Sequence, residues 1–165
     1  MEVRPIRPSE VERLAIMWRD FMNDPTATDG LIPPNQENMR RMLEFVNKLI
    51  AEDPNQVLVA DEGEGLAGYL IFQRHAKTST SLQTSRAWAY ISDLYVVPGQ
   101  RRRGVGTSLL RACLDDLRSS GVSHVRLGVW SPNRTAIDLY ERAGFEDYMH
   151  IMEADLKKTN QPRSR

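Results

Sequence analysis

Arg101-Arg102-Arg103-Gly104-Val105-Gly106-Thr107-Ser108 connects a β-rich run, residues 89–97, to a strongly amphipathic stretch with helical spacing. The first amides of a helix have no partner inside the helix, and the helix dipole adds partial positive charge at that end. Glycines at 104 and 106 let an anion approach the backbone, because a Cβ atom there would intrude. The turn is therefore a predicted phosphate-binding site.

The residues that follow the glycines exclude two other phosphate-binding turns. A P-loop needs Gly-Lys-Ser/Thr, whereas Gly106 is followed by Thr107 and Ser108. A Rossmann turn needs a third glycine, and an acidic residue at the end of the next strand. Position 109 is leucine, and the next predicted strand, 124–130, contains no acidic residue. What remains is an Arg-x-x-Gly-x-Gly turn.

Composition indicates one domain with a balanced charge. The chain has 165 residues, 22 of them basic and 22 acidic, and a single cysteine, Cys113. Such a chain can bury a core without a disulfide or a metal. The charge balance gives no reason to expect nucleic acid or an anionic membrane as a partner. The lone cysteine, the lack of a long apolar run and the polar N-terminus predict a cytoplasmic protein.

Periodicity predicts a mixed α/β domain over residues 1–156 and a flexible tail over 157–165. Apolar residues recur at helical spacing within 11–22, 39–50, 109–117 and 133–143. Strands are predicted at 3–6, 56–60, 66–72, 87–97 and 124–130, with a final strand within 145–156. The glycines of 61–65 predict a hairpin turn, and 77–85 is a Ser/Thr-rich connection. Strands in runs with helices between them favour a mixed sheet.

Two segments beside the turn carry a family resemblance. Asp93-Leu-Tyr-Val-Val-Pro98 leads into the turn, and Asn133-Arg-Thr-Ala-Ile-Asp-Leu-Tyr140-Glu-Arg-Ala-Gly-Phe145 follows it downstream. In order, interval and placement these segments resemble the GNAT superfamily of N-acetyltransferases. The resemblance implies a mostly antiparallel twisted sheet flanked by about four helices, with the fourth and fifth strands splayed around the cofactor.

The same resemblance implies acetyl-CoA as the cosubstrate and no metal. Its pyrophosphate would meet the backbone amides of Arg101, Arg102, Arg103, Gly104, Val105, Gly106 and Thr107. Arginine side chains would add charge-assisted hydrogen bonds, although three arginines in a row are otherwise an ordinary solvated run. The pantetheine arm would pair, like an added strand, with the backbone of Leu94, Tyr95 and Val96. Asn133 is equally an N-cap and a ligand contact.

Tyr140 is the candidate general acid. It matches the family tyrosine that approaches the CoA sulfur. A phenol with a pKa near ~10 is protonated at neutral pH and can give its proton to a departing thiolate. The alternative for Tyr140 is a core aromatic beside Ile137.

Asp93 is the candidate general base or water-holding group, and its alternative is a surface carboxylate in a hydrogen-bond network. Many relatives carry a glutamate on the fifth strand, where this chain has Gly128. Strand alternation places Ser92 and Asp93 on opposite faces unless a bulge intervenes, and the resemblance implies a bulge there. A proton could also leave through ordered water.

The resemblance implies transfer of an acetyl group to a primary amine by direct attack in a ternary complex. A small amine or polyamine is the expected acceptor, and carboxylates gather near the loop that borders the acceptor site in relatives: Asp20, Asp24, Asp29 and Glu37. The alternatives are a protein N-terminus or lysine as acceptor, and a CoA-binding regulatory module without turnover. A homodimer through Trp88, Tyr90 or the final strand also stays open.

Several other residues are predicted to be structural. Trp18, Phe21 and Met22 line an acceptor pocket or, more simply, pack in the core. Cys113 lies on an apolar helical stripe, which favours the core over a nucleophile. The histidines at 75, 124 and 150 lack metal-ligand spacing.

Overall fold

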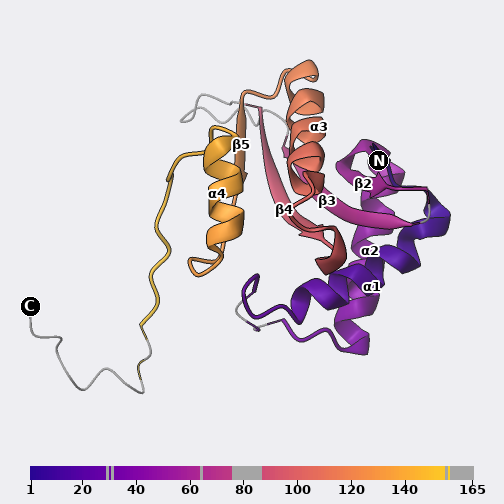
Figure 1. Cartoon of the computed structure of the whole chain (residues 1–165), viewed down its shortest axis with the longest axis horizontal. Coiled ribbons are helices and arrows are strands. Elements are labelled where there is room, and N and C mark those ends of the chain that lie inside the picture. Colours follow the sequence, from indigo (N-terminus) through magenta and orange to yellow (C-terminus); the bar gives the residue numbers. More distant parts are fainter. Residues whose placement is uncertain (29, 31, 64, 76–86, 155, 157–165) are drawn as a thin grey trace, which may run out of the picture.

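The computed structural model describes residues 1–28, 30, 32–63, 65–75, 87–154 and 156 (Figure 1). These residues form a five-stranded sheet in the order β1(Glu2–Pro5), β2(Val57–Asp61), β3(Leu66–His75), β4(Trp88–Val96) and β5(His124–Leu127). Neighbouring strands are antiparallel except for the parallel pair β4 and β5. The helical elements are η1(Pro8–Glu10), α1(Val11–Met22), α2(Gln36–Glu52), η2(Pro54–Gln56), η3(Pro98–Gln100), α3(Val105–Ser119) and α4(Arg134–Arg142). The predicted mixed α/β fold with a mostly antiparallel sheet is confirmed.

Helices cover both faces of the sheet (Figure 1). On one face, α1 and α2 contribute Leu14 and Val46 to a buried apolar cluster with β2 and β3. On the other face, α3 and α4 contribute Leu109 and Tyr140 to a second cluster with β3 and β4. The sheet residues between the two layers are fully buried on both sides, which explains the near-continuous apolar runs of β2 and β3.

A bulge interrupts β4 at Ser92. The register of β3 and β4 changes from Ile71 opposite Asp93 to Phe72 opposite Ile91, so Ser92 has no partner in β3. The Ser92 hydroxyl instead donates to the carbonyl of Ile71 at 3.3 Å. The bulge that the family resemblance implied is present, and it is a single inserted residue.

The bulge reverses which side chains of β4 face which helices. Before it, Ile91 belongs to the cluster under α3; after it, Leu94 packs against the same cluster. Asp93 lines a hollow beside α1 and α2, and Tyr95 belongs to the cluster on that face. If Ser92 took a regular place in the ladder, strict alternation from Ile91 would turn Asp93 toward α3. The bulge thus aims this carboxyl group at the α1–α2 face.

β4 and β5 separate at their carboxyl ends. Their pairing stops at Ile91 and Leu127, whereas β4 continues to Val96. The strand predicted over 124–130 therefore ends early, and 128–130 turn away from the sheet. The edge of β4 that faces away from β3 is open beyond this point, which is the expected splay.

The final strand predicted within 145–156 is wrong. The described residues of this segment contain no strand, and the chain runs away from the domain (Figure 1). Several of its apolar side chains are exposed, namely Tyr148, Met149, Ile151, Met152 and Leu156. A strand needs a hydrogen-bonded neighbour, and the described part of this segment pairs with no strand; its contact with β5 is a hydrogen bond from the Arg126 side chain to the Tyr148 hydroxyl at 2.9 Å. The tail 157–165 and the connection 77–85 lie outside the described residues.

Candidate active site

The turn before α3 has the backbone of an anion site. Arg102 and Gly104 both have left-handed conformations, with φ of 65° and 82°. A β-carbon at Gly104 would meet nothing within 4 Å, so glycine is favoured there by its backbone conformation and the space above it is open. Among the described residues, the amides of 102–107 find no acceptor, whereas the Arg101 amide donates to the carbonyl of Pro98 at 3.3 Å. Six consecutive unpaired amides at the start of a helix can together hold a phosphate.

The three arginines of the turn differ in what they contact. Arg101 donates through Nη2 to Asp24 at 3.0 Å and through Nε to the carbonyl of Val96 at 3.0 Å. Arg103 donates to the side-chain oxygen of Gln100 at 2.6 Å. Within the described part of the chain, the Arg102 side chain has no partner. Arg101 thus joins the loop after α1 to the end of β4, and phosphate binding by the three arginines stays a prediction.

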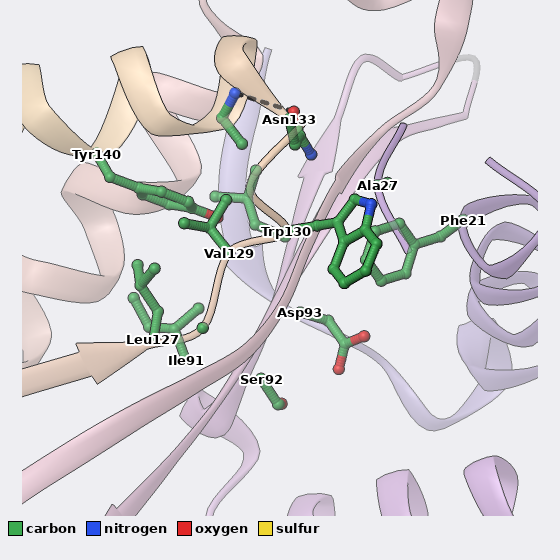
Figure 2. A pocket seen from close by; sticks show the side chains of 13 residues that line it. Phe21, Ala27, Ile91, Ser92, Asp93, Leu127, Val129, Trp130, Asn133 and Tyr140 are labelled. Carbon is green, nitrogen blue, oxygen red and sulfur yellow. Dashed lines mark hydrogen bonds between the residues drawn. The ribbon is translucent and has the colours of Figure 1, made fainter. Parts of the chain in front are cut away.

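A narrow cleft of about 50 Å³ lies between the open edge of β4, residues 127–130 and α4 (Figure 2). Leu94 lines it, so one of the three predicted pantetheine-binding residues borders the cleft. The Asn133 side chain also lines it and accepts a hydrogen bond from the Ala136 amide at 3.1 Å. Asn133 is therefore the N-cap of α4, as predicted, and stands beside the cleft.

Tyr140 lines the same cleft from α4. Its side chain is 9% exposed and its ring meets Phe145 edge-on, with centroids 5.8 Å apart. Figure 2 shows the hydroxyl end directed past Val129 toward the opening between β4 and residues 128–130. Burial, and then the charge of Asp93, raise the pKa of Tyr140 to about 12. Tyr140 is therefore a core aromatic that also lines the cleft, and its role as the general acid stays a prediction.

Asp93 lies on the other side of β4 from Tyr140 (Figure 2). The carboxyl group is only partly exposed. Burial raises its pKa to about 6, against a hydrogen bond from Ser92 that lowers it. At neutral pH the group is therefore mostly ionised yet able to take a proton, which is the property that a general base needs.

A second, larger space, which we call the α1–α2 hollow, lies beside Asp93. It measures about 600 Å³ and is lined by Trp18, Phe21, Met22, Ala27, Thr28, Ile32, Asn38, Arg41, Met42, Phe45, Ser92, Asp93, Gly128 and Trp130. The hollow shares several of these residues, Asp93 among them, with the narrow cleft. Asp93 thus stands where the two spaces meet. Trp18 and Met42 are buried in the core and line the hollow as well.

Sequence reasoning missed most of the hollow's lining. Met42 was predicted only as part of the apolar face of a helix, Phe45 was not singled out, and Trp130 was assigned to a strand that ends before it. Gly128 stands where many relatives carry a glutamate, and a β-carbon there would lie 3.1 Å from the Tyr90 hydroxyl. A larger residue at this position would therefore need the Tyr90 hydroxyl to shift by a small amount.

The described members of the expected acidic cluster, Asp20, Asp24 and Glu37, do not line the hollow. Asp24 bonds to Arg101, Asp20 bonds to Arg19, and Glu37 bonds to two arginines of α2. Asp29 lies outside the described residues. The described carboxylates of this loop are thus neutralised by arginines of the same chain, which removes the argument they gave for a polyamine.

The remaining candidates are structural. Cys113 is fully buried, and burial raises its pKa to about 12, so it is a core residue as predicted. Within the described ranges, His, Cys, Asp and Glu nowhere form a group of three or more that could hold a metal ion. Of the described helices, none combines the length and apolar character needed to cross a bilayer.

Comparison with known proteins gives a consistent result. Residues 15–145 match the acetyltransferase (GNAT) family. Thialysine N-epsilon-acetyltransferase of Mus musculus is 34% identical over 58 residues, which cover 35% of this chain and 34% of that protein. N-alpha-acetyltransferase 30 of Schizosaccharomyces pombe is 23% identical over 143 residues, covering 79% and 92% of the two chains. The chain thus spans about a third of the length of the mouse relative.

A solved structure is similar over the whole domain. It is a "predicted acetyltransferase with acetyl-CoA" from Clostridium acetobutylicum, with a TM-score of 0.71 and 18% identity over 97% of this chain and 99% of that one. At this identity the likeness concerns the fold.

Proposed function

Because the chain belongs to the acetyltransferase (GNAT) family, we propose that it transfers an acetyl group from acetyl-CoA to a primary amine by direct attack in a ternary complex. The observation that carries the proposal is the meeting of two spaces at Asp93. The narrow cleft leads from there to Tyr140, and the α1–α2 hollow leads to the opposite side of β4. A donor in one space and an acceptor in the other would react between them.

Two features support the proposed binding of the acetyl donor, acetyl-CoA: the unpaired amides of residues 102–107 and the open edge of β4. The amides favour a diphosphate, and the edge can receive an extended chain by ladder hydrogen bonds. Pro98 follows this edge closely and has no N–H to give, so the ladder ends there. The small volume of the narrow cleft suits the thioester end of the cofactor and excludes bulk water.

Each proton of the reaction has a group suited to it. The amine nitrogen attacks the thioester carbonyl, and Asp93 accepts the amine proton directly or through a water molecule. The carbon–sulfur bond then breaks, and Tyr140 donates its hydroxyl proton to the leaving sulfur. A raised pKa near 6 leaves Asp93 ionised for the first step, and a pKa near 12 keeps Tyr140 protonated for the second.

Release of free thiol from acetyl-CoA in the presence of an amine tests the proposal. Tyr140→Phe keeps the ring and its contact with Phe145 but loses the proton, so kcat should fall by about 10²-fold or more while acetyl-CoA affinity stays unchanged. Tyr148→Phe makes the same change at an exposed tyrosine and should behave as the native protein.

A CoA-binding module without turnover is the second candidate, because the family glutamate is absent at Gly128. Binding of acetyl-CoA without any amine-dependent thiol release would support this second candidate and contradict the proposed transfer. Unchanged turnover in Tyr140→Phe would remove Tyr140 from its proposed role while leaving the transferase activity in place.

A further inference from the structure

We infer that the α1–α2 hollow selects a primary amine that carries one positive charge and an apolar, ring-bearing body, and that it disfavours polyamines. The inference rests on the proposed function and names the acceptor class for it. Three observations carry it: the side chains that line the hollow, the charges among them, and the neutralisation of the nearby carboxylates.

Aromatic and sulfur-containing side chains dominate the lining. They come from α1, α2 and the segment after β5, and comprise Trp18, Phe21, Met22, Met42, Phe45 and Trp130. The aliphatic side chain of Ile32, from the loop between α1 and α2, adds to them. Rings and thioethers pack well against an aromatic ring and offer little to an extended polar chain. A volume of about 600 Å³ matches a small-molecule site rather than a void.

Of the described residues that line the hollow, two are ionisable, and they carry opposite charges. Asp93 lies at the inner end, where the two spaces meet, and can balance a single ammonium group. Arg41 brings a positive charge, and one of its nitrogens, Nε, already donates to Glu37 at 2.9 Å. A second ammonium on the acceptor would therefore meet apolar side chains or the Arg41 guanidinium, and its loss of hydration would go uncompensated.

The described carboxylate of the loop after α1, Asp24, does not change this balance. Asp24 bonds to Arg101, and Thr26 donates to the same carboxylate at 2.6 Å. Burial opposes these bonds, yet the pKa of Asp24 still lies below its usual value. Such a carboxylate is already satisfied and has little left for a distant ammonium group of an acceptor.

The test compares acceptors by thiol release from acetyl-CoA. The probes are 2-phenylethylamine, spermidine and a short peptide with a free N-terminus. We expect kcat/KM for 2-phenylethylamine to exceed that for spermidine and for the peptide by about tenfold or more. Turnover that is equal or faster with spermidine or the peptide would overturn the inference and leave the proposed transferase intact. Failure of every amine to release thiol, with acetyl-CoA bound, would contradict the proposed function and the inference with it.

A pair of matched variants tests the charge argument directly. Ile32 lines the hollow and is 54% exposed, so Ile32→Glu adds a negative charge there with little effect on the core. This change should shift the ratio of kcat/KM values toward spermidine by about fivefold, as expected for one added charge pair in water. Ile16 is 50% exposed on α1 and does not line the hollow. Ile16→Glu should leave the ratio unchanged, and an equal shift in both variants would overturn the charge argument.

Discussion

Replacing Asp93 with asparagine should stabilise the folded protein at neutral pH while removing the proposed base. Burial raises the pKa of this carboxyl group from 3.8 to about 6. The folded state therefore holds the protonated form better than the unfolded chain does. The contribution of this carboxyl group to the free energy of unfolding is therefore fully present below pH about 4 and is lost as the pH rises through about 6. The difference between the two pKa values corresponds to about 3 kcal/mol of lost stability at pH about 8.

Asparagine keeps the shape of the carboxyl group and never ionises, so Asp93→Asn should avoid this loss. For a domain of this size, about 3 kcal/mol raises Tm by about 6–12 °C. Scanning calorimetry should show that rise at pH about 8 and almost none at pH about 4, where both side chains are neutral. Asp138→Asn makes the same change at an exposed carboxylate of α4 and should shift Tm at neither pH.

The stabilised variant should also lose about 10²-fold or more in kcat/KM. An Asp93→Asn protein that melts below the native protein at pH about 8 would refute the burial argument, because the carboxylate would then be favourably bound in the fold. A stabilised variant with full activity would keep the burial argument and exclude Asp93 as the base.

Substitutions at Arg102 and Arg101 should separate a role in binding acetyl-CoA from a role in stabilising the fold. Arg102→Ala removes an exposed side chain without a described partner, so Tm should stay unchanged. The affinity for acetyl-CoA, measured by calorimetry, should fall by about tenfold, and an unchanged affinity would exclude this guanidinium as a phosphate ligand. Arg101→Ala leaves the Asp24 carboxylate, which is 17% exposed, without its ion pair. The free energy of unfolding measured by urea titration should fall by about 1 kcal/mol, and no change would contradict the structural role of Arg101.

Local patterns were enough to predict the elements that we propose to bind acetyl-CoA. The glycine turn and the helix after it follow from the backbone freedom of Gly104 and the apolar stripe of α3, both of which depend on near neighbours in the chain. The N-cap at Asn133 was predicted for the same reason. Confirmation extends to the hairpin of β2 and β3, whose turn glycines lie between two apolar runs.

The predictions that failed concern contacts between residues far apart in the chain. The pairing of Asp24 with Arg101 joins positions 77 residues apart, so the acidic loop looked like an open cation site. The final strand within 145–156 failed because an apolar segment becomes a strand only beside a partner edge. The face on which Asp93 lies could not be settled from alternation alone, since one inserted residue reverses it.

That insertion makes the conformation at Ser92 a constraint of its own. Removing Ser92 would leave Ile91 and Asp93 adjacent, opposite Phe72 and Ile71, so every other side chain of β4 would keep its face. Drawing Ser92 into the ladder would instead move Asp93 under α3, turn Leu94 and Val96 toward α1 and turn Tyr95 away from it. The position of the carboxyl group thus depends on Ser92 staying outside the pairing with β3, and not on the number of residues in the strand.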